Sequence, residues 1–222
     1  ARHGRCGMSA AKKKVAGPVT WQMTGDAVRY VRAAAIAASK DDARPILHHV
    51  HVLAVKGTVY VEATDSHRLH RITWADDYTP DMDEMVPAAW FTRNAPRKMA
   101  LGERLDLTFD ERLTMEYDGD GYSTSRCAMT VPFPNTTSLF EQYDAKPTVM
   151  DDDGIIGINP TYITDAWKAC KLIEPNTWAP NVGVRKIDVL SPMVFEMRGF
   201  ASFKAIVMPM RLTWSDDKAA TA

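Results

Sequence analysis

Long apolar runs are missing from this sequence of 222 residues. No run approaches the roughly 18 residues that a membrane-spanning helix needs, and the start ARHGRCGMSAAKKK has no apolar stretch of the kind found in signal peptides. Cysteine is scarce too, because Cys6, Cys127 and Cys170 are an odd number without a CxxC pair. This argues against a disulfide framework and for a reducing compartment. We therefore expect a soluble cytoplasmic protein with no membrane partner.

A strong net charge and the common catalytic motifs are missing as well. The net charge is -1 at pH 7, so composition alone does not mark a nucleic-acid binder. The chain has no GxxxxGK[ST] loop, no HExxH, no GxSxG, and no GxGxxG after a strand-like run. The sequence therefore gives no support for phosphotransfer or common hydrolase chemistry, and we expect no cofactor.

What the chain does contain is a repeated pattern of predicted elements, with 45% apolar residues to form a core. Helical periodicity predicts three amphipathic helices: one from about Asp26 to Ser39, one that begins at Pro87 and ends before Pro96, and one that begins after the cap residue Asn159. Each follows one strand-like run and precedes three more. The pattern predicts an α+β fold of three similar units, each of about 60 to 70 residues.

Positive charge is concentrated on the predicted helices. Lys and Arg outnumber Asp and Glu on all three, although the whole chain is slightly acidic. A basic helical surface on an otherwise acidic protein suits a polyanion such as the DNA backbone, although charged runs also occur on ordinary solvated faces. The candidate DNA contacts are Arg29, Arg32, Lys40, Arg93, Arg97, Lys98, Lys168 and Lys171.

The segment ATDSHRLHRIT, residues 63 to 73, crowds reactive residue types together. Its histidines, His67 and His70, lie on the segment beside a strand in which His49 and His51 share one face. A metal-dependent enzyme centred on these four histidines is therefore one hypothesis, although no carboxylate or cysteine completes a recognised ligand spacing. Asp65 is interpreted as a residue that holds a turn, because Asp side chains accept hydrogen bonds from the backbone that follows them.

Several segments together resemble the bacterial DNA polymerase III beta sliding clamp. RPILHHVHV followed by ATDSHRLH resembles the second domain of that family, and IVMPMRL resembles its extreme C-terminus. MVPAAWF is similar to the family's VP-initiated helix, and TVPFPNTTSLF is similar to its linker between domains. The resemblance covers roughly residues 19 to 212.

The resemblance implies the fold of the DNA clamps, which is built from β-α-β-β-β modules with the helices inside and antiparallel sheets outside. It implies a clamp domain of two modules over residues 18–140 and a half-domain of one module over 141–212. Residues 1–17 are expected to be a flexible basic arm, and residues 213–222 a tail.

By the same resemblance, the chain would be a non-enzymatic processivity factor that encircles duplex DNA. It would tether DNA polymerase and the clamp loader through a pocket that captures short peptides. On the residues that match, this pocket would comprise Leu47, Thr64, Ser66, His67, Arg68, Leu69, Pro134, Leu139, Val207, Met208, Pro209, Met210, Arg211 and Leu212.

The chain departs from the family in size. It has three predicted units where the family has six, so a ring of the usual size would need about four copies, arranged head to tail. A tetramer is favoured over a trimer or dimer. A short, divergent member suggests a bacteriophage protein that acts in the cytoplasm of its host. A peptide-binding adaptor that forms no ring is a further alternative.

Overall fold

The elements of the structure follow the predicted repeat. The computed structural model describes residues 17–127, 132–144, 157–178, 180–186, 191–199 and 201–210. In chain order, the first unit is β1 (Val19–Met23), α1 (Gly25–Ala35), the short 3-10 helix η1 (Pro45–His48), β2 (His49–Val55), β3 (Thr58–Thr64) and β4 (Arg68–Ala75). The second is β5 (Met82–Pro87), α2 (Ala88–Asn94), β6 (Leu105–Phe109), β7 (Arg112–Tyr117) and β8 (Asp120–Ser125). After α3 (Thr136–Asp144), the third comprises α4 (Pro160–Ile173), β9 (Gly183–Arg185), β10 (Met193–Met197) and β11 (Ser202–Val207).

The helices begin where the sequence predicts. The Asn159 side chain accepts a hydrogen bond from the Thr161 amide, with Pro160 at the first helical position. Pro87 differs slightly from the prediction, because it is the cap residue of α2 rather than its first helical residue. Helix α1 ends at Ala35, before the predicted Ser39.

Two antiparallel sheets connect the units. One has the order β1-β6-β7-β8 and the other β5-β2-β3-β4-β11-β10-β9. The first two units exchange their first strands, because β1 pairs with β6 of the second unit and β5 pairs with β2 of the first. The third unit joins the first edge to edge, where β11 pairs with β4 and Ile206 lies opposite Leu69. Both kinds of contact extend hydrogen-bonded ladders across unit boundaries.

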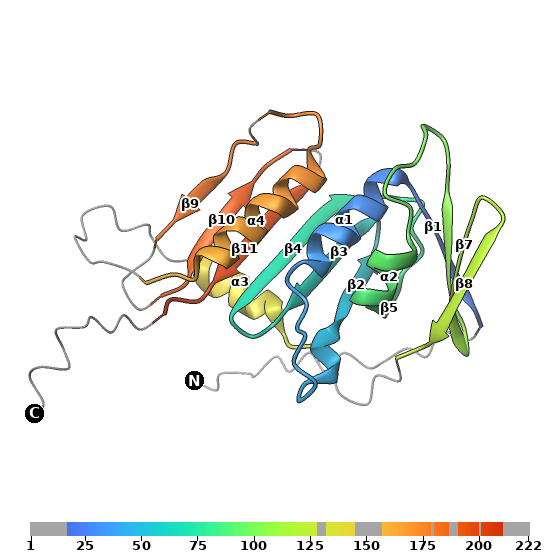
Figure 1. Cartoon of the computed structure of the whole chain (residues 1–222), viewed down its shortest axis with the longest axis horizontal. Coiled ribbons are helices and arrows are strands. Elements are labelled where there is room, and N and C mark those ends of the chain that lie inside the picture. Colours follow the sequence, from blue (N-terminus) through green and yellow to red (C-terminus); the bar gives the residue numbers. More distant parts are fainter. Residues whose placement is uncertain are drawn as a thin grey trace, which may run out of the picture.

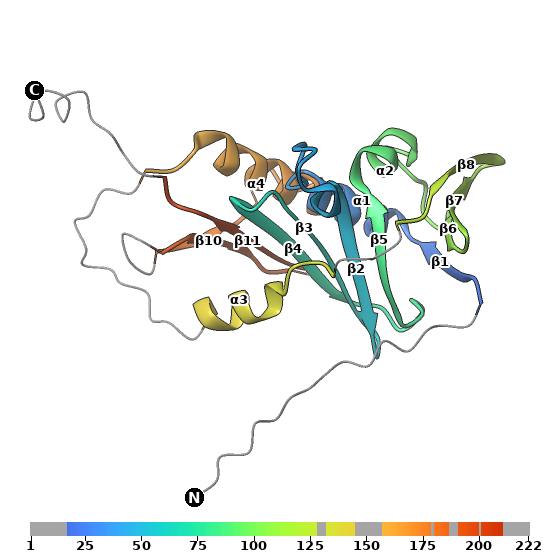
Figure 2. The ribbon, with the colours of Figure 1, turned by 90° about the horizontal axis from the view of Figure 1, so that it is seen from below.

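The helices and sheets form layers. Helices α1, α2 and α4 lie side by side on one face of the sheets, and α3 lies on the opposite face of the larger sheet (Figures 1 and 2). Strand β2 shows the expected alternation, with Val50, Val52 and Ala54 buried. The small buried residues Ala33 and Ala34 let α1 pack closely between the sheet and α4. The α+β fold with antiparallel sheets is thus confirmed.

Helix α3 was not predicted, because its sequence was interpreted as part of a linker. It begins after Asn135, whose side chain accepts a hydrogen bond from the Ser138 amide. Its apolar side chains Phe140 and Tyr143 pack with Leu69 and Ile206 in a small cluster separate from the main core. This helix forms one wall of the site described below.

Some predicted segments cannot be compared with the structure. The predicted arm up to residue 16 and the predicted tail lie outside the described residues. The same is true of residues 154–156, which belong to the strand predicted before the third helix. The division into a domain at 18–140 and a half-domain at 141–212 stays a prediction. Within the described ranges, no helix has the length and apolar character needed to cross a bilayer.

Candidate peptide-binding pocket and helix surface

The corner between β3 and β4 is held by its own polar side chains. Asp65 Oδ1 accepts hydrogen bonds from the amides of His67 and Arg68, both at 2.9 Å. The Thr64 hydroxyl donates to the Arg68 carbonyl at 2.6 Å and accepts from the Ser66 amide. Ser66 has a φ of 80°, in the left-handed region that such tight corners require. Asp65 therefore stabilises the turn, as its sequence position suggested.

A pocket of about 400 Å³ lies between this corner, α3 and the end of β11. Part of its lining was predicted from the sequence: Thr64, Ser66, Arg68, Leu69, Pro134, Leu139 and Met208. The rest was missed: Asn135, Thr136, Ser138, Gln142 and Ile206. Most of the missed residues belong to α3 or its first turn, so a helix prediction over the linker would have found them.

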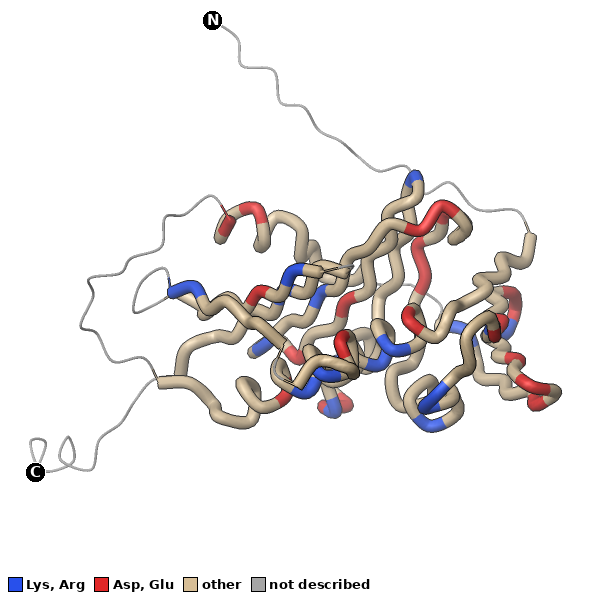
Figure 3. The backbone as a smooth tube through the Cα atoms, turned by 90° about the horizontal axis from the view of Figure 1, so that it is seen from above, with Lys and Arg blue, Asp and Glu red and all other residues tan. Residues whose placement is uncertain are grey.

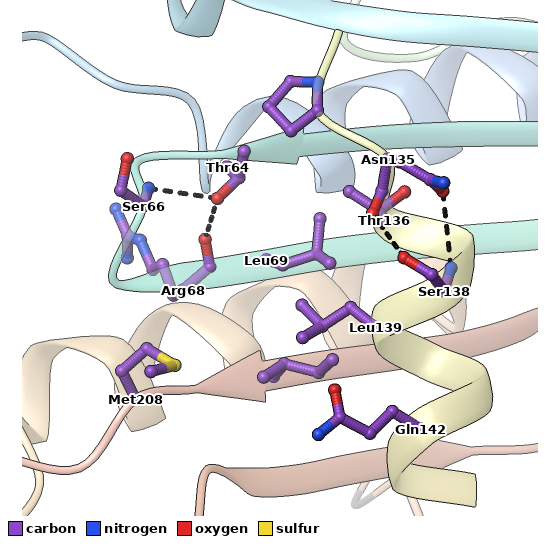
Figure 4. Close-up of a pocket in the computed structure, with 12 residues that line it drawn as sticks. Thr64, Ser66, Arg68, Leu69, Asn135, Thr136, Ser138, Leu139, Gln142 and Met208 are labelled. Atoms are coloured by element: carbon purple, nitrogen blue, oxygen red, sulfur yellow. Dashed lines mark hydrogen bonds between the residues drawn. The ribbon is translucent and has the colours of Figure 1, made fainter.

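The pocket combines an apolar floor with a polar rim. Leu139 extends from α3 toward Leu69 on β4, and Met208 lies near one end of the pocket (Figure 4). Gln142 and Ser138 line it from the helix side (Figure 4). An apolar side chain of a peptide could be buried on this floor, while rim amides and hydroxyls bond to its backbone. Methionine adapts to side chains of different shape.

The remaining predicted pocket residues lie elsewhere. Leu47 lines a neighbouring pocket of about 620 Å³ that shares Ser66 and Pro134 with the first. His67 is exposed beside the corner, and Val207 is fully buried, because the alternation of β11 directs Ile206 rather than Val207 toward the pocket. Pro209 and Met210 follow the strand without lining this pocket, and Arg211 and Leu212 lie outside the described residues.

Arg68 joins two units of the fold. Its guanidinium forms ion pairs with Asp65 and with Asp165 of α4, and it donates to the Ile36 carbonyl at 2.9 Å. It also lies over the ring of Tyr162, 4.7 Å from the ring centre. The side chain is only 10% exposed. Its main contacts therefore connect β4 to α4, although it also contributes to the pocket wall.

The histidines of the metal hypothesis have separate partners. His49 Nδ1 lies 3.0 Å from the Pro45 carbonyl oxygen, and the buried His70 Nδ1 lies 3.2 Å from that of Ala33. Burial lowers the pKa of both rings, that of His70 to about 4, with only partial compensation from these carbonyls. Within the part of the chain that the structure describes, no His, Cys, Asp and Glu side chains gather in a group of three or more that could hold a metal ion.

His51 belongs to a polar network beneath α3, in which His51 and Glu62 are largely buried and Asp83 is exposed. Its Nδ1 lies 3.0 Å from Glu62 and its Nε2 2.9 Å from Asp83. Glu62 also accepts from Arg71 at 2.8 Å and from the Thr136 hydroxyl at 2.6 Å. Because Thr136 is the first residue of α3, this network attaches the pocket-forming helix to the sheet. The sequence offered no signal for it, since its members are far apart in the chain.

The basic helix residues fall into two groups. Some are held by other parts of the protein: Arg29 pairs with Asp26, Arg32 donates to two carbonyl groups at the end of α2, Lys168 pairs with Asp165, and Lys171 donates to the carbonyl groups of Thr177 and Trp178. Others are exposed at or after the helix ends: Lys40, Arg93, Arg97 and Lys98. Basic residues lie along the helix side of the molecule, interspersed with acidic ones (Figure 3).

Comparison with solved structures decides the fold. The DNA polymerase III beta chain of Streptococcus pneumoniae superposes with a TM-score of 0.68 over 93% of this chain and 68% of its own, at 18% identity. The fold is that of a bacterial sliding clamp. The sliding clamp of Bacillus subtilis gives a TM-score of 0.66 at 16% identity, covering 90% of this chain and 66% of the clamp. The C. crescentus beta sliding clamp gives 0.66 at 17% identity, covering 91% and 67%.

The sliding-clamp fold is carried by a divergent sequence of smaller size. The chain spans about two thirds of the length of these clamps, from 66% to 68%. No protein-family profile matches the sequence, and no curated protein sequence matches it. The resemblance to sliding clamps that ATDSHRLH and IVMPMRL suggested is confirmed by the similarity of the three-dimensional structures.

Proposed function

We propose that this protein is a DNA sliding clamp, a non-enzymatic processivity factor. Copies of the chain form a ring around duplex DNA, and the pocket binds short peptide segments of DNA polymerase and of the clamp loader. Residues 18–140 form one clamp domain, and residues 141–212 form half of a second. No cofactor takes part in this activity.

One observation carries the proposal: the pocket lies where β4 and β11 meet beneath α3 in a sliding-clamp fold. Residues from three distant segments of the chain come together there. Its apolar floor and polar rim suit a short peptide with large apolar side chains. A docking site of this kind recruits partners without chemistry of its own.

The exposed basic residues support the DNA part of the proposal. Arg93 belongs to α2, and Arg97 and Lys98 follow that helix. Helix α2 lies on the opposite side of the sheets from α3 (Figure 2). Lys and Arg side chains bind phosphates without reading bases. A ring with its helices inside would therefore contact DNA of any sequence, and these phosphate contacts would weaken at high salt.

The pocket is tested with Leu139→Ala. Leu139 lines the pocket from α3 and is only partly buried, so shortening it removes binding surface without opening the main core. We expect the dissociation constant for a fluorescent clamp-binding peptide of a bacterial DNA polymerase to rise about tenfold, corresponding to about 1 to 2 kcal/mol. Fluorescence anisotropy measures this value.

Leu101→Ala is the matched control. Leu101 is fully exposed in a turn, and it does not line the pocket. Its affinity for the peptide should equal that of the unmodified protein. Equal affinities for Leu139→Ala and the unmodified protein would show that peptides bind elsewhere.

The ring is tested by retention on DNA. A clamp loaded on nicked circular DNA should stay bound through gel filtration and be lost once the DNA is cut to a linear form. An adaptor that keeps the pocket but forms no ring would bind peptides equally well and show no difference between the two DNA forms.

A further inference from the structure

Among the described residues, the third unit lacks the partner that the first two units give each other. We propose, within the proposed clamp function, that it pairs with the third unit of a second copy. The contact is two-fold, α4 against α4, with Trp167 of one copy next to Trp167 of the other.

Helices α1 and α2 show what such a contact looks like in this chain. The fourth residues after their cap residues are Val28 and Phe91, which are 2% and 0% exposed. The eighth residues are Arg32 and Ala95, and these meet directly: the Arg32 guanidinium donates to the Ala95 carbonyl at 3.0 Å and to that of Thr92 at 3.2 Å. The eighth positions are thus where the paired units touch, and the fourth positions, one turn earlier, are buried in the shared core.

In α4 the same positions are exposed and apolar. Counted from the cap residue Asn159, the fourth and eighth residues are Ile163 and Trp167, which are 41% and 44% exposed. They lie on the flank of α4 away from Asp165, which faces Arg68 of the first unit. An aliphatic and an indole side chain at adjacent turns of one helix favour burial.

The sheet of the third unit is open beside this flank. In the second unit, β6 lies between β1 and β7. Its counterpart β9 pairs with β10 and has no second neighbouring strand among the described residues. Val184 in the middle of β9 is 50% exposed. An edge strand with unpaired backbone groups beside an apolar helix face is typical of a surface that another chain covers.

A second copy fits this surface because the internal pairing is nearly symmetric. The first and second units exchange equivalent strands, and their eighth helix residues meet each other. A surface that pairs equivalent positions is self-complementary, so two identical third units can satisfy each other by a two-fold rotation. The helix that carries Trp167 then fills the place that α2 has beside α1.

This contact changes the expected order of copies in the ring. Two third units meet, which leaves β8, the last strand of its sheet in the part of the chain that the structure describes, as the edge at each outer end. Strand β8 is the counterpart of β4 in the first unit, and β4 pairs with β11 of another unit. The edge of β8 is therefore of the kind that joins units. In the ring of about four copies expected from the repeat, contacts between two third units would alternate with contacts between two second units. This order would replace a head-to-tail order.

The first test compares Ile163→Arg with Leu101→Arg in the full chain. Native mass spectrometry should show an even number of copies for the unmodified protein. Ile163→Arg should halve the mass of the assembly, because a charge replaces the apolar contact, while Leu101→Arg should leave it unchanged. An unchanged mass for Ile163→Arg, or a monomeric unmodified protein, would overturn the two-fold contact.

The second test detects the symmetry and does not depend on breaking the assembly. Trp167→Cys is introduced with Cys6→Ser and Cys127→Ser, since Cys170 is fully buried. Mild oxidation should link two copies through residue 167, whereas Leu101→Cys in the same background should give no dimer. If Trp167→Cys does not link to itself but links to Tyr122→Cys on β8, the order is head to tail and the inference is wrong.

Retention on nicked circular DNA separates this inference from the clamp function. Retention without a link at residue 167 would overturn the two-fold contact and leave the clamp. A link at residue 167 without retention would support the contact and overturn the ring on DNA.

Discussion

At the level of single residues, His51 connects the stability of the protein to pH. Burial by itself would lower the pKa of this ring, but hydrogen bonds and charge from Asp83 and Glu62 outweigh burial and raise it to about 9. The ring is therefore protonated at neutral pH. The pKa of Glu62 is lowered, because His51, Arg71 and Thr136 favour its charged form more strongly than burial disfavours it.

We predict that the protein loses stability as pH rises through about 9. A histidine whose pKa is raised on folding stabilises the protein fully below its ordinary value of 6.5, and this stabilisation is lost as pH passes the folded value. The loss should reach up to about 3 kcal/mol in the free energy of unfolding. Urea unfolding at pH values from 6 to 10 measures it.

His51→Gln is the control, because glutamine keeps hydrogen-bonding atoms and does not titrate. The difference in free energy of unfolding between the unmodified protein and His51→Gln should be largest near pH 6 and vanish near pH 10. A constant difference over this range would mean that His51 is not charged at neutral pH.

At the scale of elements, the junction of β4, α4 and α1 depends on Arg68. Its guanidinium pairs with Asp165 on α4 and with the Ile36 carbonyl beyond α1, and both side chains of the ion pair are nearly buried, at 10% and 12% exposed. Removing one member of such a pair leaves the other buried without its charge partner. This junction lies directly behind the pocket corner, so its stability and the shape of the pocket are connected.

We predict that Arg68→Ala and Asp165→Ala each lower the free energy of unfolding by about 3 kcal/mol. The double variant should lose less than the sum of the two, because the interaction can be removed only once. Lys168→Ala is the matched control: Lys168 pairs with the same carboxylate but is 59% exposed, so its loss should be less than about 1 kcal/mol. Additive effects for Arg68 and Asp165 would contradict the coupling.

At the scale of the whole molecule, the layers separate the two proposed binding surfaces. The exposed Arg93, Arg97 and Lys98 belong to or follow α2, and α3 with the candidate pocket lies on the other face of the larger sheet (Figure 2). A ring with helices inside could therefore bind DNA and a polymerase peptide at the same time, because the sheet lies between the two.

Replacing Arg93, Arg97 and Lys98 together by glutamine should weaken DNA retention and its dependence on salt. The slope of log affinity against log salt should fall by about 0.9 for each phosphate contact that is lost. Filter binding at several salt concentrations measures this slope. Lys56→Gln with Arg198→Gln, outside the helices, should leave it unchanged, and an unchanged slope in the triple variant would place DNA on another surface.

Sequence periodicity was sufficient for the order of elements but not for α3. The start of α4 could be predicted because the cap Asn159 and Pro160 act within one turn of the helix. Helix α3 is held by a buried network that includes Glu62, and it buries Phe140 on strands far away in sequence. Such long-range contacts leave no local pattern, so the α3 side of the pocket was missed.

The sequence by itself determined the repeat of units, the α+β class and the pocket corner, because caps, strand alternation and Asp65 act over a few residues. Only the tertiary structure decided which basic residues are exposed, which strand residue faces the pocket and that Arg68 joins two units. These depend on which distant segments lie together, as when β11 pairs with β4. The open flank of α4, with Trp167 exposed, likewise appears only when the three units are compared in space.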